Sequence, residues 1–219
     1  MKEFKKIGVL TSGGDAPAMN AAVRAVTRAA LAHGVEVVAI NRGYSGLIQN
    51  DVKLMSVRDV SNILNKGGTI LYSDRCPEFK TEEGMAKAVA NCHRFGIDGI
   101  IAIGGDGTFR GATDLSRHGI PTVGLTGTID NDITATDYTV GFDTAMNSVL
   151  NAVDQLRDTA ESHQMCMIVE VMGRDCGLIA LHTGLTTGAL AIAIPEMPFD
   201  EDFAIGKLSS ARAQGKRGL

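Results

Sequence analysis

The sequence predicts an α/β protein in which helices cover both faces of a parallel β-sheet, as in Rossmann-like three-layer folds. Short apolar runs alternate with helical stretches, and glycine-rich loops follow several of these runs. An apolar run that ends in glycines is typical of a buried parallel strand that opens into a helix. Because crossovers between parallel strands are right-handed, we expect the loops at Gly13, Gly43, Gly104 and Gly127 to lie at one edge of the sheet, where ligands bind.

Composition limits the classes of protein that the chain can belong to. Its 219 residues are 44% hydrophobic and 21% charged, which is ordinary for one large or two small globular domains. The formal net charge of −4 gives no reason to expect nucleic acid or an anionic membrane as a partner. No apolar segment approaches a membrane span, and no signal-peptide core follows Met1, so the cytoplasm is the expected location. The four cysteines include no Cys-x-x-Cys pair, which favours reduced thiols over a zinc site.

Apolar runs and helical spacing predict the elements of the first half of the chain. These are a strand at 7–10, a helix at 20–33, a strand at 35–40, a loop at 41–46, a helix at 57–65, an irregular loop at 72–77 and a helix at 82–95. The first helix places four residues along one face, namely Ala22, Val26, Ala29 and Ala30. The last helix has four expected core positions, namely Met85, Val89, Cys92 and Phe95, and Gly96 as its stop.

The same reasoning predicts the elements of the second half. These are a strand from Gly99, helices at 109–118 and 142–158, strands at 121–125, 165–172 and 190–194, and a helix at 200–214. Residues 215–219 are typical of a loop before a further strand. We therefore expect the chain to be a fragment.

The stretch from Gly99 to Gly111 is the strongest candidate for a phosphate site. Its apolar strand ends at Gly104 and Gly105, so the backbone amides of the next helix are free to meet an anion. Asp106 would repel a phosphate unless a divalent cation lay between them, which indicates a magnesium nucleotide. The alternative is a tight turn in which Asp106 only caps the helix. The loop from Thr11 to Asn20 is a second candidate for a phosphate loop.

Several other polar residues have both a functional and a structural interpretation. Arg24 and Arg28 could hold one anion from a shared helix face or form a solvated surface pair. Tyr44 could stack on a base or serve as a turn residue. A lone cation, Arg75, lies in the irregular loop.

Two further candidate sites also have both a functional and a structural interpretation. Asp130 and Asp132 would point to one side of an extended backbone, or could simply form a turn. Arg174 follows a glycine after an apolar run, where it could clamp a phosphate or make a surface pair.

Four motifs together resemble those of the bacterial ATP-dependent 6-phosphofructokinases. They are Gly13-Gly14-Asp15-Ala16-Pro17, Gly104-Gly105-Asp106-Gly107-Thr108, Thr128-Ile129-Asp130-Asn131-Asp132 and Met172-Gly173-Arg174. They occur in the same order and at matching intervals, and the resemblance extends to the last residue. The Gly-Gly-Asp-Gly-Thr box alone also occurs in NAD kinases and diacylglycerol kinases, and no Walker-type Gly-x-x-x-x-Gly-Lys-Ser/Thr motif is present.

The resemblance implies an activity and a domain organisation. The activity is transfer of the γ-phosphoryl group of ATP to the 1-hydroxyl of fructose 6-phosphate, with Mg²⁺ as cofactor, in a homotetramer. The implied fold has an ATP-binding α/β domain at 1–140 and the beginning of a sugar-phosphate-binding α/β domain at 141–219. An inactive nucleotide-binding or subunit-interaction module, or a related kinase that shares the glycine box, is the alternative.

The resemblance also implies roles for individual residues. The ATP-binding residues are Gly14, Tyr44, Arg75, Cys76, Gly105, Asp106, Gly107, Thr108 and Gly111, with Asp106 on the metal. The catalytic residues are Asp130 as the base, with Thr128, Asp132 and Arg174. The sugar-phosphate contacts are Thr128, Ile129, Asp130, Met172, Gly173 and Arg174. The effector-site residues are Arg24, Arg28, Arg157 and Lys216.

Four positions bear on the choice of donor, on sugar-phosphate binding and on regulation. Pyrophosphate-using relatives typically have Asp at the position of Gly107 and Lys at that of Gly127, so two glycines here favour ATP. Met165 stands where the family usually presents an arginine to the sugar phosphate. Leu190 replaces a polar effector-site residue, which argues against control by ADP or phosphoenolpyruvate.

Overall fold

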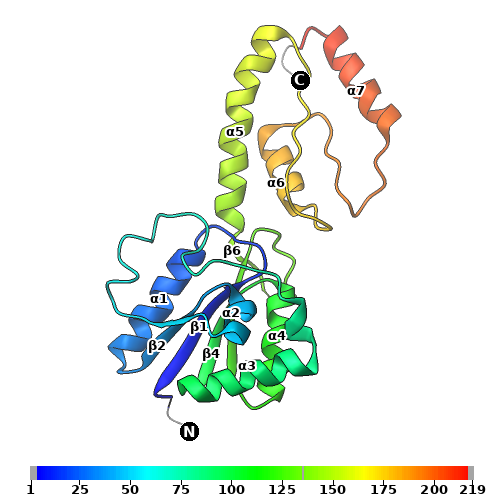
Figure 1. Cartoon of the computed structure of the whole chain (residues 1–219). Coiled ribbons are helices and arrows are strands. Elements are labelled where there is room, and N and C mark those ends of the chain that lie inside the picture. Colours follow the sequence, from blue (N-terminus) through cyan, green and yellow to red (C-terminus); the bar gives the residue numbers. More distant parts are fainter. Residues whose placement is uncertain (1–3, 135, 217–219) are drawn as a thin grey trace. The chain divides into compact units, whose positions relative to one another are not determined.

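Figure 1 shows the computed structural model, which describes residues 4–134 and 136–216. The chain divides into two compact units. The first comprises the residues up to Thr128 together with Ile133–Gly141, and the second comprises Ile129–Asp132 together with the residues from Phe142 onward.

The first unit is built on a mixed sheet of six strands in the order β3-β2-β1-β4-β5-β6. The strands are β1 (Lys6–Ser12), β2 (Glu36–Ile40), β3 (Val52–Leu54), β4 (Gly99–Gly104), β5 (Thr122–Thr128) and β6 (Val140–Gly141). All neighbours pair in parallel except β3, which runs antiparallel to β2 at one edge. The four strands predicted in this part of the chain are confirmed, whereas β3 and β6 were not anticipated.

Helices cover both faces of this sheet (Figure 1). They are α1 (Met19–Ala32), α2 (Gly43–Gln49), α3 (Glu82–Phe95) and α4 (Asp106–Arg117), with a short 3₁₀ helix, η1 (Pro77–Lys80). The helix predicted at 82–95 is confirmed. Its start is capped by the Thr81 hydroxyl, which accepts a hydrogen bond from Gly84 N at 3.0 Å, and its end by Gly96 in a left-handed conformation. Met85 and Cys92 are buried as expected, and Val89 and Phe95 pack at the edge of the same core.

The strand order places a topological switch point between β1 and β4. The chain leaves β1 through α1 toward β2 on one side, and leaves β4 through α4 toward β5 on the other. In open α/β sheets, ligands bind at the carboxyl ends of the strands that flank such a point. Those two ends are Ser12 and Gly104, so each glycine loop predicted to bind phosphate follows one of the two flanking strands.

The buried face of α1 differs from the predicted one. The buried residues are Met19, Asn20, Val23 and Thr27, whereas Ala29 is exposed and Ala22, Val26 and Ala30 are only partly buried. The alanine spacing was misleading because alanine is accepted on either side of a helix. The larger side chains of Met19 and Val23 gain more from burial and decide which face packs on the sheet.

Thr27 offers a test of this packing. Its side chain is 0% exposed, and its hydroxyl has no hydrogen-bond partner among the described residues. A buried hydroxyl without a partner is costly, and valine has nearly the same shape. Thr27→Val should therefore raise the free energy of unfolding by about 1 kcal/mol, measured as an increase of several degrees in Tm. Thr27→Ser, which keeps the hydroxyl and loses a methyl group, should lower it; a fall in Tm for the valine variant would show that the hydroxyl is satisfied.

Two predictions for residues 41–65 are wrong. Residues 43–49 form α2 rather than a loop, because Gly43 and Gly46 let this helix pack against its surroundings. A Cβ on Gly43 would lie 2.8 Å from Thr11 O, and one on Gly46 would overlap Asn41 O.

No helix forms at 57–65, where the chain makes successive turns. The Asp59 carboxylate accepts hydrogen bonds from Ser56 N and Oγ, which competes with helix formation.

The second unit contains the helices α5 (Phe142–His163), α6 (Leu178–Thr187) and α7 (Glu201–Ala213). The predicted helices at 142–158 and 200–214 are therefore confirmed, although α5 is longer than expected. The strands predicted at 165–172 and 190–194 are not present. An apolar extended segment becomes a strand only when a neighbour completes its backbone hydrogen bonds, and the described part of this unit supplies no such neighbour. Ile168 in the first of these segments is 96% exposed.

Candidate functional site

The two glycine loops at the switch point are joined by Thr108. Its hydroxyl donates a hydrogen bond to Ser12 O, at the end of β1, over 2.9 Å. Gly104 must lack a side chain for this link to form, because a Cβ there would lie 2.3 Å from Thr108 Oγ1 and 2.5 Å from Ser12 O. The exposed Gly14 has open space around its Cα, so its side of the site is accessible to a ligand.

The N-terminus of α4 faces this position with its backbone amides uncapped. Gly105 is the N-cap residue, and as a glycine it has no side chain that could accept a hydrogen bond from the first turn. Gly107 is exposed, and nothing lies within 4 Å of the position that a Cβ would occupy there. Such a helix end, with glycines that expose its amides, is suited to a phosphate group.

Asp106 is the first residue of α4 and is exposed. One of its carboxylate oxygens forms an ion pair with Arg110 NH2 over 2.8 Å, which leaves the other oxygen available. No group of three or more metal-ligating side chains occurs among the residues that the structure describes. A single carboxylate suits Mg²⁺, which keeps several waters and takes its other ligands from substrate phosphates.

Arg75 and Cys76 are brought to the same place by the segment that precedes η1. Gly13 N donates to Asp74 O over 3.3 Å, and the Ser73 hydroxyl donates to Gly13 O. Arg75 is exposed beside this loop, whereas Cys76 is partly buried and packs against the core. The exposed guanidinium is therefore the better placed of the two to meet a charged ligand.

Tyr44 lies inside the fold rather than on its surface. Its ring is 4% exposed and stacks on Phe79 with 4.0 Å between ring centroids, and its hydroxyl donates to Thr108 O over 2.6 Å. Burial, with a smaller contribution from Asp114, raises its pKa, so the hydroxyl keeps its proton. Gly111 allows this arrangement, because a Cβ there would lie 2.8 Å from the Tyr44 ring. The structure therefore gives both residues a packing role beside the loop.

The second unit holds a cluster of charged groups around Asp130. Burial raises the pKa of Asp130, the neighbouring charge of Asp132 raises it further, and Arg174 lowers it. Asp132 and Arg174 thus both act electrostatically on Asp130, although Arg174 comes from a distant part of the sequence. The prediction of an extended backbone through Asp130 and Asp132 is wrong, because Asn131 between them has a left-handed conformation with φ 53°.

The remaining predicted substrate residues differ in their surroundings. Thr128 ends β5 in the first unit, and its carbonyl accepts a hydrogen bond from the Thr139 hydroxyl over 2.7 Å. Ile129 is partly buried. In the second unit, Met172 is 74% exposed, and the backbone of Gly173 has φ 144°, a conformation that favours glycine.

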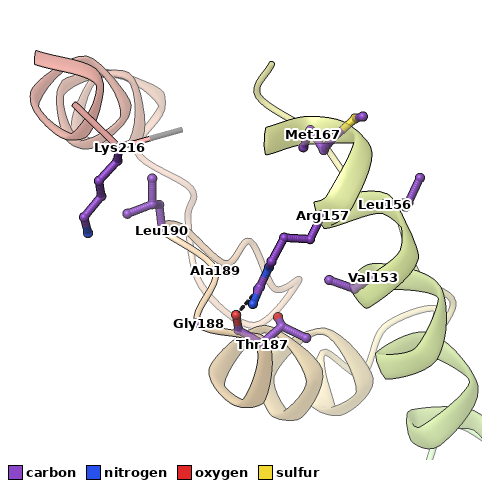
Figure 2. A pocket seen from close by; sticks show the side chains of 10 residues that line it. Val153, Leu156, Arg157, Met167, Thr187, Gly188, Ala189, Leu190 and Lys216 are labelled. Carbon is purple, nitrogen blue, oxygen red and sulfur yellow. Dashed lines mark hydrogen bonds between the residues drawn. The ribbon is translucent and has the colours of Figure 1, made fainter. Parts of the chain in front are cut away.

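The predicted effector residues fall into two pairs. Arg24 and Arg28 lie on α1, where Arg24 NH1 donates to Val60 O over 2.6 Å and Arg28 is exposed. In the second unit, Arg157 and Lys216 line a cavity of about 370 Å³ (Figure 2). Leu190 contributes to the wall of this cavity, and Arg157 NH2 donates to the carbonyl oxygen of Thr187. Met165 is exposed at the end of α5.

Sequence reasoning missed Asp74, whose carbonyl oxygen accepts hydrogen bonds from Gly13 N and Ser12 Oγ beside the Gly13 loop. It also missed Asn20, a buried residue whose side chain holds residues 66–70. Polar residues inside a loop or a helix give no sequence signal of such distant contacts. Among the described residues, no helix has the length and apolarity that crossing a membrane requires.

The comparisons with known proteins agree on one family over nearly the whole chain. The model of the family described as Phosphofructokinase matches residues 6–219. The chain is 54% identical over 214 residues to an ATP-dependent 6-phosphofructokinase of Halalkalibacterium halodurans, covering 98% of this chain and 67% of the relative. It is 56% identical over 213 residues to ATP-dependent 6-phosphofructokinase 1 of Clostridium perfringens, covering 97% of this chain and 67% of the relative.

A solved structure agrees with these relatives. The phosphofructokinase of Saccharomyces cerevisiae matches with a TM-score of 0.88 at 39% identity, over 96% of this chain and 32% of that one. The chain thus spans about two thirds of the length of the curated relatives, and about a third of the yeast chain.

Proposed function

Because the chain belongs to the phosphofructokinase family, we propose that it carries the ATP site and the catalytic base for phosphorylation of fructose 6-phosphate. The reaction moves the γ-phosphoryl group of ATP to the sugar's 1-hydroxyl. The observation that carries this proposal is the pair of glycine loops, joined by Thr108, at the switch point of the sheet. Relatives that are 54% and 56% identical to this chain over the aligned residues are named for this activity.

The two substrates, ATP and fructose 6-phosphate, would bind to different domains. Residues 1–140 would form the ATP-binding domain, and residues 141–219 the beginning of the sugar-phosphate-binding domain. In the first, the amides at the start of α4 and the exposed Arg75 offer hydrogen bonds and charge to the phosphates. Gly14, Gly105, Gly107 and Thr108 would shape this cradle, while Tyr44, Cys76 and Gly111 would support it from the core side.

Asp130 would act as the general base. Its carboxylate would accept the proton of the 1-hydroxyl as that oxygen attacks the γ-phosphorus. The raised pKa of Asp130 makes it a stronger proton acceptor than an ordinary carboxylate. Thr128 and Arg174 would stabilise charge on the group in transfer, and Asp132 would keep the pKa of Asp130 high.

Mg²⁺ is the expected cofactor, and Asp106 is the residue that would hold it. The ion would neutralise charge on the ATP phosphates, as divalent metals do in kinase reactions generally. An ion held by this carboxylate would make an acidic residue compatible with an anion site.

Further contacts of the proposed enzyme follow the family pattern. Ile129, Met172 and Gly173 would contact the sugar phosphate. Arg24, Arg28, Arg157 and Lys216 would belong to an effector site in a homotetramer. We expect the protein to act in the cytoplasm, without a nucleic-acid or membrane partner.

The direct test is formation of fructose 1,6-bisphosphate from ATP and fructose 6-phosphate, with and without Mg²⁺. The alternative is that this chain only binds nucleotide, because it spans 67% of the length of its curated relatives. Calorimetric titration with ATP separates the two. Product formation supports the enzyme, ATP binding without product supports the binding module, and absence of ATP binding contradicts both.

The electrostatics of Asp130 predict the pH dependence of turnover. A base must be deprotonated, so activity should fall as the pH drops through the raised pKa of Asp130. Asp132→Asn removes a repulsive charge and should move this acid limb to lower pH. Arg174→Gln removes an attractive charge and should move it to higher pH.

Profiles of kcat against pH for the three proteins check this prediction. The position of the limb is the measured quantity, since Arg174→Gln is also expected to reduce the maximal rate. Limbs that coincide, or that move in the same direction in both variants, would contradict the assignment of Asp130 as the titrating base.

A further inference from the structure

The segment from Lys66 to Cys76, called the strap below, is tied along the end of β1. Thr11 Oγ1 donates to Tyr72 O over 2.8 Å. Asn20 donates through Nδ2 to Lys66 O over 3.0 Å, and its Oδ1 accepts from Ile70 N over 2.7 Å. Side chains of β1 and α1 therefore hold an otherwise irregular segment against the loop that follows β1.

Asp74 is the residue at which the strap meets three other parts of the site. Its carbonyl oxygen accepts hydrogen bonds from Gly13 N over 3.3 Å and from Ser12 Oγ over 3.4 Å. Its carboxylate accepts one from Ser45 Oγ in α2 over 2.8 Å and one from Arg75 N over 2.7 Å. Ser45 is buried, so the carboxylate is attached to a fixed point of the fold.

The charge of Asp74 gives no advantage for binding an anion. A carboxylate next to Arg75 and the Gly13 loop repels phosphate groups, and among the residues that the structure describes it forms no ion pair that would cancel this charge. Its two hydrogen bonds are those of an acceptor that fixes the backbone of Arg75 to α2. The cost in repulsion and the gain in order thus act on ATP affinity in opposite directions.

We propose that Asp74 is a positioning residue for the nucleotide site: its carboxylate fixes the backbone of Asp74 and Arg75 to Ser45 of α2, and the Asp74 carbonyl oxygen, held in this way, fixes Gly13 N. This inference rests on the proposed function. The inference adds that the two hydrogen bonds accepted by the Asp74 carboxylate strengthen ATP binding. It also states that this gain in affinity is larger than the loss caused by electrostatic repulsion between the carboxylate and the phosphates.

Three variants separate ordering from charge. Asp74→Ala removes the charge and both acceptors, whereas Asp74→Asn removes the same charge and keeps one acceptor oxygen. Ser45→Ala removes one hydrogen bond and leaves the charge in place. ATP affinity is measured by calorimetry with Mg²⁺ on the whole chain, and the Tm of each variant is recorded.

Asp74→Ala should raise the Kd for ATP about tenfold, as expected for loss of a hydrogen bond to a charged acceptor. Asp74→Asn should bind ATP more tightly than Asp74→Ala, although the two variants have equal charge. Ser45→Ala should weaken binding about threefold in the wild type and not at all in Asp74→Ala, because its partner is then missing.

Glu83→Ala is the matched control, because it removes an exposed carboxylate elsewhere in the same unit; its Kd should equal that of the wild type. Unchanged or tighter binding by Asp74→Ala would overturn the inference, since removal of repulsion alone predicts that result. Equal Kd values for Asp74→Asn and Asp74→Ala would also overturn it. If the wild type does not bind ATP, the proposed function itself fails. If the wild type binds ATP but the Asp74 variants do not differ as stated, only the inference fails.

Discussion

Asp130→Asn should lower the turnover number for fructose 6-phosphate phosphorylation by about 10²- to 10⁴-fold while the affinity for ATP stays nearly the same. Asparagine keeps the size and shape of the side chain but cannot accept the proton of the attacking hydroxyl. It also removes the group whose pKa is raised by burial and by Asp132. The loss should therefore appear in the chemical step and not in binding.

The measurement is a coupled assay of product formation, on this chain and on a chimaera that continues with the last third of a 54%-identical relative. Asp154→Asn is the control, because it makes the same chemical change at an exposed position of α5 in the same unit. It should retain wild-type turnover. An unchanged kcat for Asp130→Asn, or an equal loss in both variants, would remove Asp130 from the role of base.

The sequence predicted the parts of the fold in which local pattern and packing agree. The apolar runs of β1 and β4 lead to glycines, with Gly13 just after β1 and Gly104 at the end of β4, and α3 has a capping threonine and a terminal glycine. All of these signals are local in the sequence. Residues 43–49 form a helix in spite of two glycines, because Tyr44 and Leu47 are buried against the rest of the first unit. Tertiary packing overrides helix propensity there, and no window of sequence contains that contact.

The residues of the candidate site likewise divide into those that the sequence predicts and those that it does not. Glycine loops and Asp106 could be recognised because the chemistry of phosphate binding restricts residue types at fixed spacing. The electrostatic effect of Arg174 on Asp130 and the contacts of Asp74 could not be recognised, since each depends on residues far apart in the sequence. The burial of Tyr44 could not be predicted, because a tyrosine between glycines has no periodic partner that would reveal it.

Gly107 is a position where the stability of the fold and the affinity for ATP are expected to respond in opposite directions. It lies exposed in the first turn of α4, and nothing stands within 4 Å of an added Cβ. Its φ is not in the left-handed region, so a side chain is compatible with the backbone. Aspartate is also favourable in the first turn of a helix, where it meets the positive end of the dipole.

Gly107→Asp should therefore raise the Tm or leave it unchanged, and should weaken ATP binding at least about tenfold. Two unit charges 4 Å apart repel by about 1 kcal/mol in water and about 4 kcal/mol near a protein surface, and about 1.4 kcal/mol is tenfold in affinity. Gly107→Asn has the same size without the charge, so the ratio of the two Kd values isolates repulsion from steric exclusion. Wild-type affinity in Gly107→Asp would place the phosphates away from α4, whereas a lower Tm would show that the loss comes from the fold. Stable protein with weaker binding is the combination that only a phosphate site at this helix end produces.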